Sequence, residues 1–214
     1  MVLSLVKRSH LQLAAFALGT VGWIMCTISM GLVGWRVWHV DNTTVISSGI
    51  AWVGIWKVCF ISYLHVSPGY EEQFCHKFKA FESFVPHEIY AAQGLLLIAM
   101  ILGLVALTAT IFALRNIYMG IANKTITHFF LVGGFFFIFS GLCVLIPVSW
   151  NFYSVARNES IAFPPSYHMP SSPVSQEVGA AIPIGIIAVI LLLLSGTFSL
   201  SYVFPAISNT IMQS

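Results

Sequence analysis

Residues 51–59, AWVGIWKVC, place two tryptophans, a glycine and a cysteine in the most polar part of a very hydrophobic chain. The segments around them, WRVWHV (35–40) and CFISYLHV (59–66), are rich in aromatic and β-branched residues, which favour strands. A turn signal, SPGYEE, follows at residues 67–72. These patterns predict a small antiparallel sheet in which AWVGIWKVC forms one central strand.

The chain as a whole is too hydrophobic for a soluble domain. Of its 214 residues, 58% are hydrophobic and only 7% are charged, whereas a soluble domain carries about 25% charged residues. So few charges cannot cover a surface in water, and the composition predicts an integral membrane protein. The net charge of +2 and the lack of a basic run argue against nucleic acid as a partner.

Four runs without charged residues are long enough for helices that cross a bilayer, since each crossing needs about 20 apolar residues. A helix also satisfies its own backbone hydrogen bonds in lipid, so the fold class predicted is a four-transmembrane-helix bundle. The first run follows Lys7 and Arg8, as in a signal peptide, but it exceeds a normal h-region and no cleavage pattern ends it, so we interpret it as a retained span.

The predicted single domain divides into residues 1–10 (cytosolic), 11–33 (first span), 34–87 (first outside loop), 89–114 (second span), 115–127 (cytosolic loop), 128–150 (third span), 151–177 (second outside loop), 178–204 (fourth span) and 205–214 (short cytosolic tail).

The charges predict the orientation. Segments 1–10 and 115–127 carry basic residues and no acids, whereas all seven acidic residues fall in the other two loops. By the positive-inside rule, both termini are predicted to be cytosolic. Glycosylation sequons at Asn42 and Asn158 then lie outside and are candidate modification sites, whereas a third at Asn123 lies inside.

Cys59 and Cys75 are the two cysteines of the first outside loop. Because the extracellular space is oxidising, we expect a disulfide between them, and closing a loop of about 17 residues stabilises the fold by about 3 kcal/mol. A zinc site built from these thiols and His76 is the alternative, but the usual four-ligand spacing is missing. We therefore predict no metal and no other cofactor. Cys26 and Cys143 fall inside spans, where small apolar packing is expected.

The second outside loop is polar and proline-rich, with the run FPPSYHMPSSPVS at residues 163–175. Its composition fits a plain connector and a partner-binding segment equally well. No arrangement typical of an enzyme is present, because serine, histidine and aspartate are scattered and no glycine-rich phosphate loop precedes a helix.

The motifs together resemble those of the claudins, four-helix proteins of tight junctions. The family signature is represented by Trp35, Gly54, Trp56, Cys59 and Cys75, with isoleucine in place of leucine at residue 55. The stretches LQLAAFALGTVGW (11–23), GLCVLIPVSW (141–150) and EVGAAIPIG (177–185) also look like claudin spans. Wider relatives share the signature, including peripheral myelin protein and auxiliary subunits of glutamate receptors and calcium channels.

The resemblance implies a four-helix bundle with an extracellular antiparallel sheet from the first outside loop and part of the second. Trp56 would pack against the extracellular ends of the helices. The resemblance also implies a multi-pass plasma-membrane protein of bicellular tight junctions, in contact with lipid, that binds other claudins in cis and trans. It would form a paracellular barrier, an adhesive contact or an ion pore. The alternative is an auxiliary subunit of a channel or receptor.

Two features bear on partners and selectivity. The claudin C-terminal Tyr-Val, which engages PDZ scaffolds, is absent, so PDZ binding is doubtful. In pore-forming relatives, charges after the second cysteine set selectivity, and the matching residues here are His76, Lys77, Phe78 and Lys79. Lysines at a pore would attract anions and repel cations. The alternative is that both are ordinary solvated loop charges.

Overall fold

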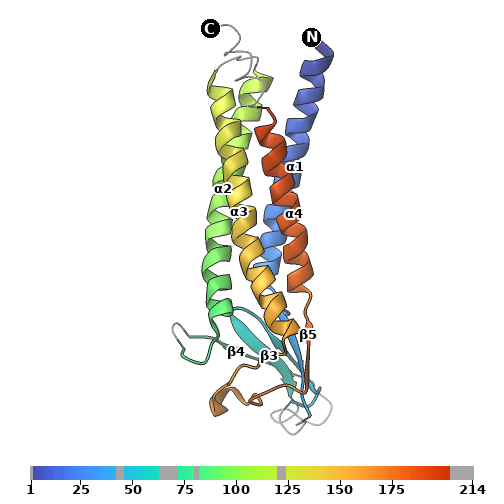
Figure 1. The fold of residues 1–214 in the computed structure, drawn as a ribbon, viewed down its shortest axis with the longest axis vertical. Helices are drawn as coiled ribbons and strands as arrows, with labels where there is room; N and C mark the ends of the chain where they lie inside the picture. The colour runs from blue at the N-terminus through green and yellow to red at the C-terminus, as the bar shows by residue number, and fades with distance from the viewer. Residues whose placement is uncertain (1, 42–45, 63–71, 80–81, 120–123, 203–214) are drawn as a thin grey trace. The chain divides into compact units, whose positions relative to one another are not determined.

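The computed structural model describes residues 2–41, 46–62, 72–79, 82–119 and 124–202. This part of the chain contains four long helices, shown in Figure 1: α1 (Val2–Gly31), α2 (His87–Tyr118), α3 (Lys124–Ala156) and α4 (Ala181–Leu200). Each helix is long and apolar enough to cross a membrane. The structure therefore confirms the predicted four-helix membrane fold.

The chain forms two compact units. The first comprises residues 1–27, 96–145 and 186–214, and the second comprises residues 28–95 and 146–185. In the first unit, buried or half-buried polar side chains donate to backbone carbonyls of a neighbouring helix: Trp23 to Met100 (3.0 Å), Ser140 to Ala99 (2.9 Å) and Ser195 to Ala15 (2.6 Å). Such bonds satisfy polar groups where lipid offers no partner.

The second unit contains a five-stranded sheet. Its strands are β1 (Arg36–His39), β2 (Ile50–Val53), β3 (Lys57–Ser62), β4 (Glu72–Lys77) and β5 (Ser175–Val178). All neighbouring pairs are antiparallel, in the order β4-β3-β2-β1-β5. Strand β5 comes from the second outside loop, so both loops contribute to one sheet, as expected.

The prediction that AWVGIWKVC forms one strand is wrong. The stretch is a hairpin, because β2 ends at Val53 and β3 begins at Lys57. The amide of Gly54 donates to the carbonyl of Lys57 at 2.9 Å and closes the turn. A Cβ atom on Gly54 would lie 2.9 Å from Cα of Val33, so only glycine fits where the turn approaches this backbone.

The two faces of the sheet differ, because side chains alternate along each strand. The core face carries buried side chains of β1, β2 and β3: Arg36, Trp38, Ala51, Val53, Val58 and Phe60. The opposite face carries polar and partly exposed side chains and the disulfide: Val37, Trp52, Lys57, Cys59, Cys75 and Lys77. The sheet is thus half-buried, as antiparallel sheets commonly are.

Candidate functional site

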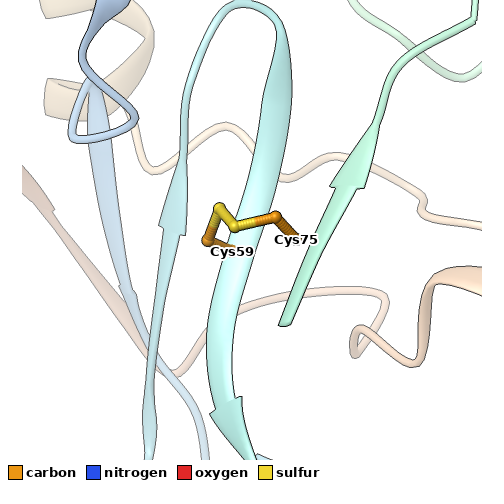
Figure 2. Close-up of a disulfide and its surroundings, with 2 residues drawn as sticks. All are labelled: Cys59 and Cys75. Carbon is orange, nitrogen blue, oxygen red and sulfur yellow. A yellow bond between two sulfur atoms is a disulfide. The ribbon is translucent and has the colours of Figure 1, made fainter. Parts of the chain in front are cut away.

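A disulfide joins Cys59 and Cys75, as the sequence predicts. The two cysteines lie directly opposite each other in the β3–β4 ladder, with their Cα atoms 4.1 Å apart. Figure 2 shows the bond spanning these neighbouring strands. Because β4 pairs with no other described strand, the disulfide fastens an edge of the sheet.

Two signature tryptophans fasten the sheet to the last turn of α1. The indole N–H of Trp35 donates to the carbonyl of Ser29 at 3.0 Å, and that of Trp56 donates to the carbonyl of Met30 at 3.1 Å. Trp35 is buried, whereas Trp56 is 37% exposed. The expectation that Trp56 packs against a helix end is therefore confirmed.

The four residues after Cys75 do not act as one group. His76 and Phe78 face aromatic rings: His76 lies 6.2 Å from Phe60, and Phe78 lies 6.4 Å from Phe163, centroid to centroid. The side chains of Lys77 and Lys79 are exposed. Of the four residues, the two lysines are therefore the most accessible to solutes or a partner.

An aromatic cluster links the two outside loops. It consists of Phe78, Phe84, Phe163 and Tyr167, whose neighbouring ring centroids lie 5.2–6.4 Å apart. The first two residues belong to the first loop and the other two to the second. Phe163 also meets Trp38 of the core face edge-on at 5.4 Å. The second loop is therefore more than a plain connector, because part of it completes the core of this unit.

The hydroxyl of Tyr167 adds a hydrogen bond to the aromatic cluster. Its hydroxyl lies 2.9 Å from the carboxylate of Glu82 and 3.1 Å from the carbonyl of Lys77, and it can donate its one proton to either acceptor. Burial, together with this hydrogen bond and the negative charge of Glu82, raises the pKa of Tyr167 to about 12. The hydroxyl therefore stays protonated and donating at physiological pH.

A buried ion pair forms the polar centre of the same unit. Nη2 of Arg36 donates to Oε1 of Glu88 at 2.7 Å and to Oδ1 of Asn151 at 3.2 Å. The hydroxyl of Ser154 donates to the same carboxylate oxygen at 3.2 Å. Strand β1 is thereby tied to both α2 and α3. Sequence reasoning missed this network, because Arg36 and Glu88 served only to mark where apolar runs begin and end.

A small cavity opens beside the disulfide-bonded strands. Its volume is about 310 Å³, and its lining includes Trp56, Lys57, Lys77 and the end of α1 at Gly31. Among the described residues, no group of three or more histidines, cysteines, aspartates and glutamates could hold a metal ion. The lining of the cavity thus combines two lysines with apolar and aromatic side chains, among them Leu32, Trp56 and Phe78.

The family follows from comparison with known proteins. A family model described as PMP-22/EMP/MP20/Claudin tight junction matches residues 20–201. The chain belongs to the claudin family. It is 27% identical to claudin-4 of Bos taurus over 190 residues, which cover 87% of this chain and 83% of that protein. Against claudin-5 of Homo sapiens it is 29% identical over 190 residues, covering 87% and 79%.

In this claudin-family protein, Gln93 lies in the first turns of α2. Its amide donates to the carbonyl of Ile55 at 2.6 Å, so it supports the hairpin turn from α2. Asn158 is exposed just after α3, in a left-handed conformation with φ of 52°. The Asn42 sequon and the segment 205–214, on which PDZ binding depends, lie outside the described residues.

Proposed function

We propose that this claudin-family protein is a tight-junction component of the plasma membrane that contributes to the paracellular barrier and to cell–cell adhesion. The observation that carries the proposal is that both outside loops build one sheet and one aromatic cluster. A surface held in one conformation loses less entropy when it binds a partner. Such a surface suits adhesion between the outside loops of two cells.

The free edges of the sheet support assembly with other claudins. Strands β4 and β5 are the two edges of the described sheet, so each has one side without a strand partner there. An exposed edge can accept a strand from a neighbour through backbone hydrogen bonds. We propose binding to like chains in cis through these edges and in trans through the loop surface.

Expression in a claudin-deficient epithelium tests the proposal. We expect the protein to concentrate at cell–cell contacts and to raise transepithelial resistance, and freeze-fracture strands should appear when it is expressed in fibroblasts. A Cys59→Ser variant is the matched control, since it loses the bond that holds β4 to β3. Diffuse surface staining with unchanged resistance would refute the proposal, and co-purification of a large channel would favour the auxiliary-subunit alternative.

For ion permeation, we propose that any pore formed by this protein disfavours cations. Lys77 and Lys79 are exposed after the second cysteine, and neither forms an ion pair with another described residue. Positive charge at a pore repels cations and attracts anions. Dilution potentials across an expressing monolayer should show preference for chloride, which Lys77→Glu and Lys79→Glu should reduce. A cation-preferring potential, or one that both variants leave unchanged, would contradict the assignment.

A further inference from the structure

Two lysines face each other on neighbouring strands. Lys57 of β3 lies directly opposite Lys77 of β4, one ladder position beyond the pair of Val58 and His76. Directly opposite residues share a face and hold their Cβ atoms about 5 Å apart, so like charges there destabilise a sheet. A sheet that keeps such a pair has two positive charges available for a shared anionic partner.

The rest of the strand pair holds the two lysines in place. The Cys59–Cys75 disulfide is the next pair on the same face, two residues along each strand. Beyond the lysines, the amide of Phe78 donates to the carbonyl of Trp56 at 2.9 Å and continues the ladder. Neither lysine forms an ion pair with another residue that the structure describes. The backbones of the two lysines are therefore held side by side, and neither charge is neutralised within the described chain.

The cavity beside the lysines lies where a membrane span ends. Both lysines line it together with Trp56 and residues 31–33, and the candidate span of α1 ends at Gly31. A Cβ atom on Gly31 would meet no atom within 4 Å, so there is open space beside this end of α1. Tryptophan is enriched at the level of lipid headgroups. The indole N–H of Trp56 is already bonded to Met30, which leaves its ring to contact a ligand.

From this geometry we infer that the cavity binds the anionic headgroup of a membrane lipid. The negatively charged oxygens, which a sulfate, phosphate or carboxylate group supplies equally well, lie between Lys57 and Lys77. The lipid body lies beside Trp56 and the end of α1. With the predicted orientation, the lipid belongs to the outer leaflet. The inference does not rest on the proposed function, because it is argued from the cavity and the lysine pair alone. Lys77 belongs to both proposals, whereas Lys57 belongs only to this one.

Binding of a sulfated lipid to the purified full chain in detergent tests the inference. The probe is sulfatide, and galactosylceramide, the same lipid without the sulfate, is the matched ligand. Native mass spectrometry should show sulfatide bound in preference to galactosylceramide. Lys57→Gln or Lys77→Gln should each weaken sulfatide binding by ~5-fold, as expected from the attraction of one lysine to an anionic membrane surface. Loss of both lysines should weaken binding by ~30-fold, because the two effects multiply.

The control is Lys79→Gln, because Lys79 is exposed in the same segment but does not line the cavity. Its binding of sulfatide should equal that of the unmodified chain. Equal binding of sulfatide and galactosylceramide would overturn the inference. So would inorganic sulfate that displaces sulfatide at equal concentration, because the site would then recognise a free anion and not a lipid.

A purely structural role for the lysines gives a different result. Basic side chains near the C-terminal end of a helix can balance its carbonyl groups, and both lysines lie near the end of α1. If that were their whole role, Lys57→Gln would lower the thermal midpoint of the protein and leave its preference for sulfatide intact. That outcome would overturn the inference.

Discussion

The carboxylate of Glu88 is almost fully buried and accepts hydrogen bonds from Arg36 and Ser154. Glu88→Gln would leave the buried guanidinium of Arg36 without its counter-charge, and breaking a buried pair in this way costs about 3–5 kcal/mol. We therefore expect a large drop in the free energy of unfolding, measured by thermal unfolding of the purified protein in detergent.

The control for Glu88 is Glu177→Gln. Glu177 forms an exposed pair with His39 at 3.5 Å, and exposed pairs contribute at most about 1 kcal/mol. Its removal should leave the unfolding temperature almost unchanged. Equal effects of the two substitutions would show that the buried pair is not a centre of stability.

The Tyr167 hydroxyl predicts loss of stability at alkaline pH. Its pKa is raised from 10 to about 12 in the folded protein, so the unfolded chain loses this proton first. The stabilisation is complete below pH 10 and is lost as the pH rises from 10 to about 12. Two pKa units correspond to roughly 2–3 kcal/mol. In Tyr167→Phe, the free energy of unfolding should therefore depend less on pH across this range than it does in the unmodified protein.

Tyr118→Phe is the control for Tyr167, because Tyr118 is 93% exposed. Its alkaline profile should match that of the unmodified protein. An unchanged profile for Tyr167→Phe would mean that other groups cause the alkaline loss.

Sequence reasoning identified residues that carry a recognisable pattern, and it missed residues whose role depends on contact in space. Cys59 and Cys75 were expected to pair because they are the two cysteines of one outside loop. Arg36 and Glu88 are 52 positions apart and belong to different elements. Their charges were visible in the sequence, but no local pattern showed that the two side chains meet.

At the scale of elements, the β2–β3 hairpin depends on the absence of a side chain at residue 54. Gly54→Ala would place Cβ 2.9 Å from Cα of Val33 and 3.1 Å from the carbonyl oxygen of Lys57. Because both are backbone atoms, the turn must shift, and overpacking of this kind costs about 1–3 kcal/mol. The substitution should lower the unfolding temperature and the yield of folded protein.

Gly94→Ala is the matched control for the hairpin. Gly94 lies in α2, and a Cβ atom there would meet nothing within 4 Å. Alanine favours a helix over glycine by up to about 1 kcal/mol, so this variant should be equal or more stable. Destabilisation by both substitutions alike would argue against a specific clash at Gly54.

The disulfide makes β4 part of the sheet. Cys59→Ser should destabilise the protein by about 3 kcal/mol, the value expected for a closed loop of this length. Cys75→Ser removes the same bond, so the double variant should be no less stable than either single variant. Unfolding in detergent without reductant measures all three. If the double variant lost as much stability as the two single variants added together, the two cysteines would act separately.

The elements themselves were only partly predictable. The helices followed from long apolar runs, because lipid allows few alternatives to a helix. The turn at residues 54–56 was missed because Gly-Ile-Trp lacks the proline, asparagine and aspartate that usually mark a turn. The role of the second loop in the sheet was expected, but the packing of its Phe163 and Tyr167 into the aromatic cluster was missed, since both residues stand in a proline-rich run without strand periodicity.

At the scale of the whole molecule, the charge distribution predicts which side of the membrane each loop occupies. We expect Asn158 to carry an N-linked glycan when the protein is made in animal cells, because its sequon lies in a predicted outside loop and its side chain is exposed. Treatment with an N-glycosidase should increase the gel mobility of the protein.

Asn158→Gln should abolish the change in gel mobility that N-glycosidase causes through the glycan on Asn158. Asn123→Gln should have no effect on gel mobility, because Asn123 lies in a predicted cytosolic loop. A shift that depends on Asn123 would reverse the predicted orientation.

The pairing of β5 with β1 and the contact of Phe163 with Phe78 have a practical consequence for protein engineering. The two loops that were predicted to lie outside are halves of one folded body and cannot be treated as interchangeable modules. A chimera that received only one loop from another claudin would combine two surfaces that had never been selected to fit. Loss of function in such a chimera would then report a folding defect, so the loops of this protein are best exchanged as a pair.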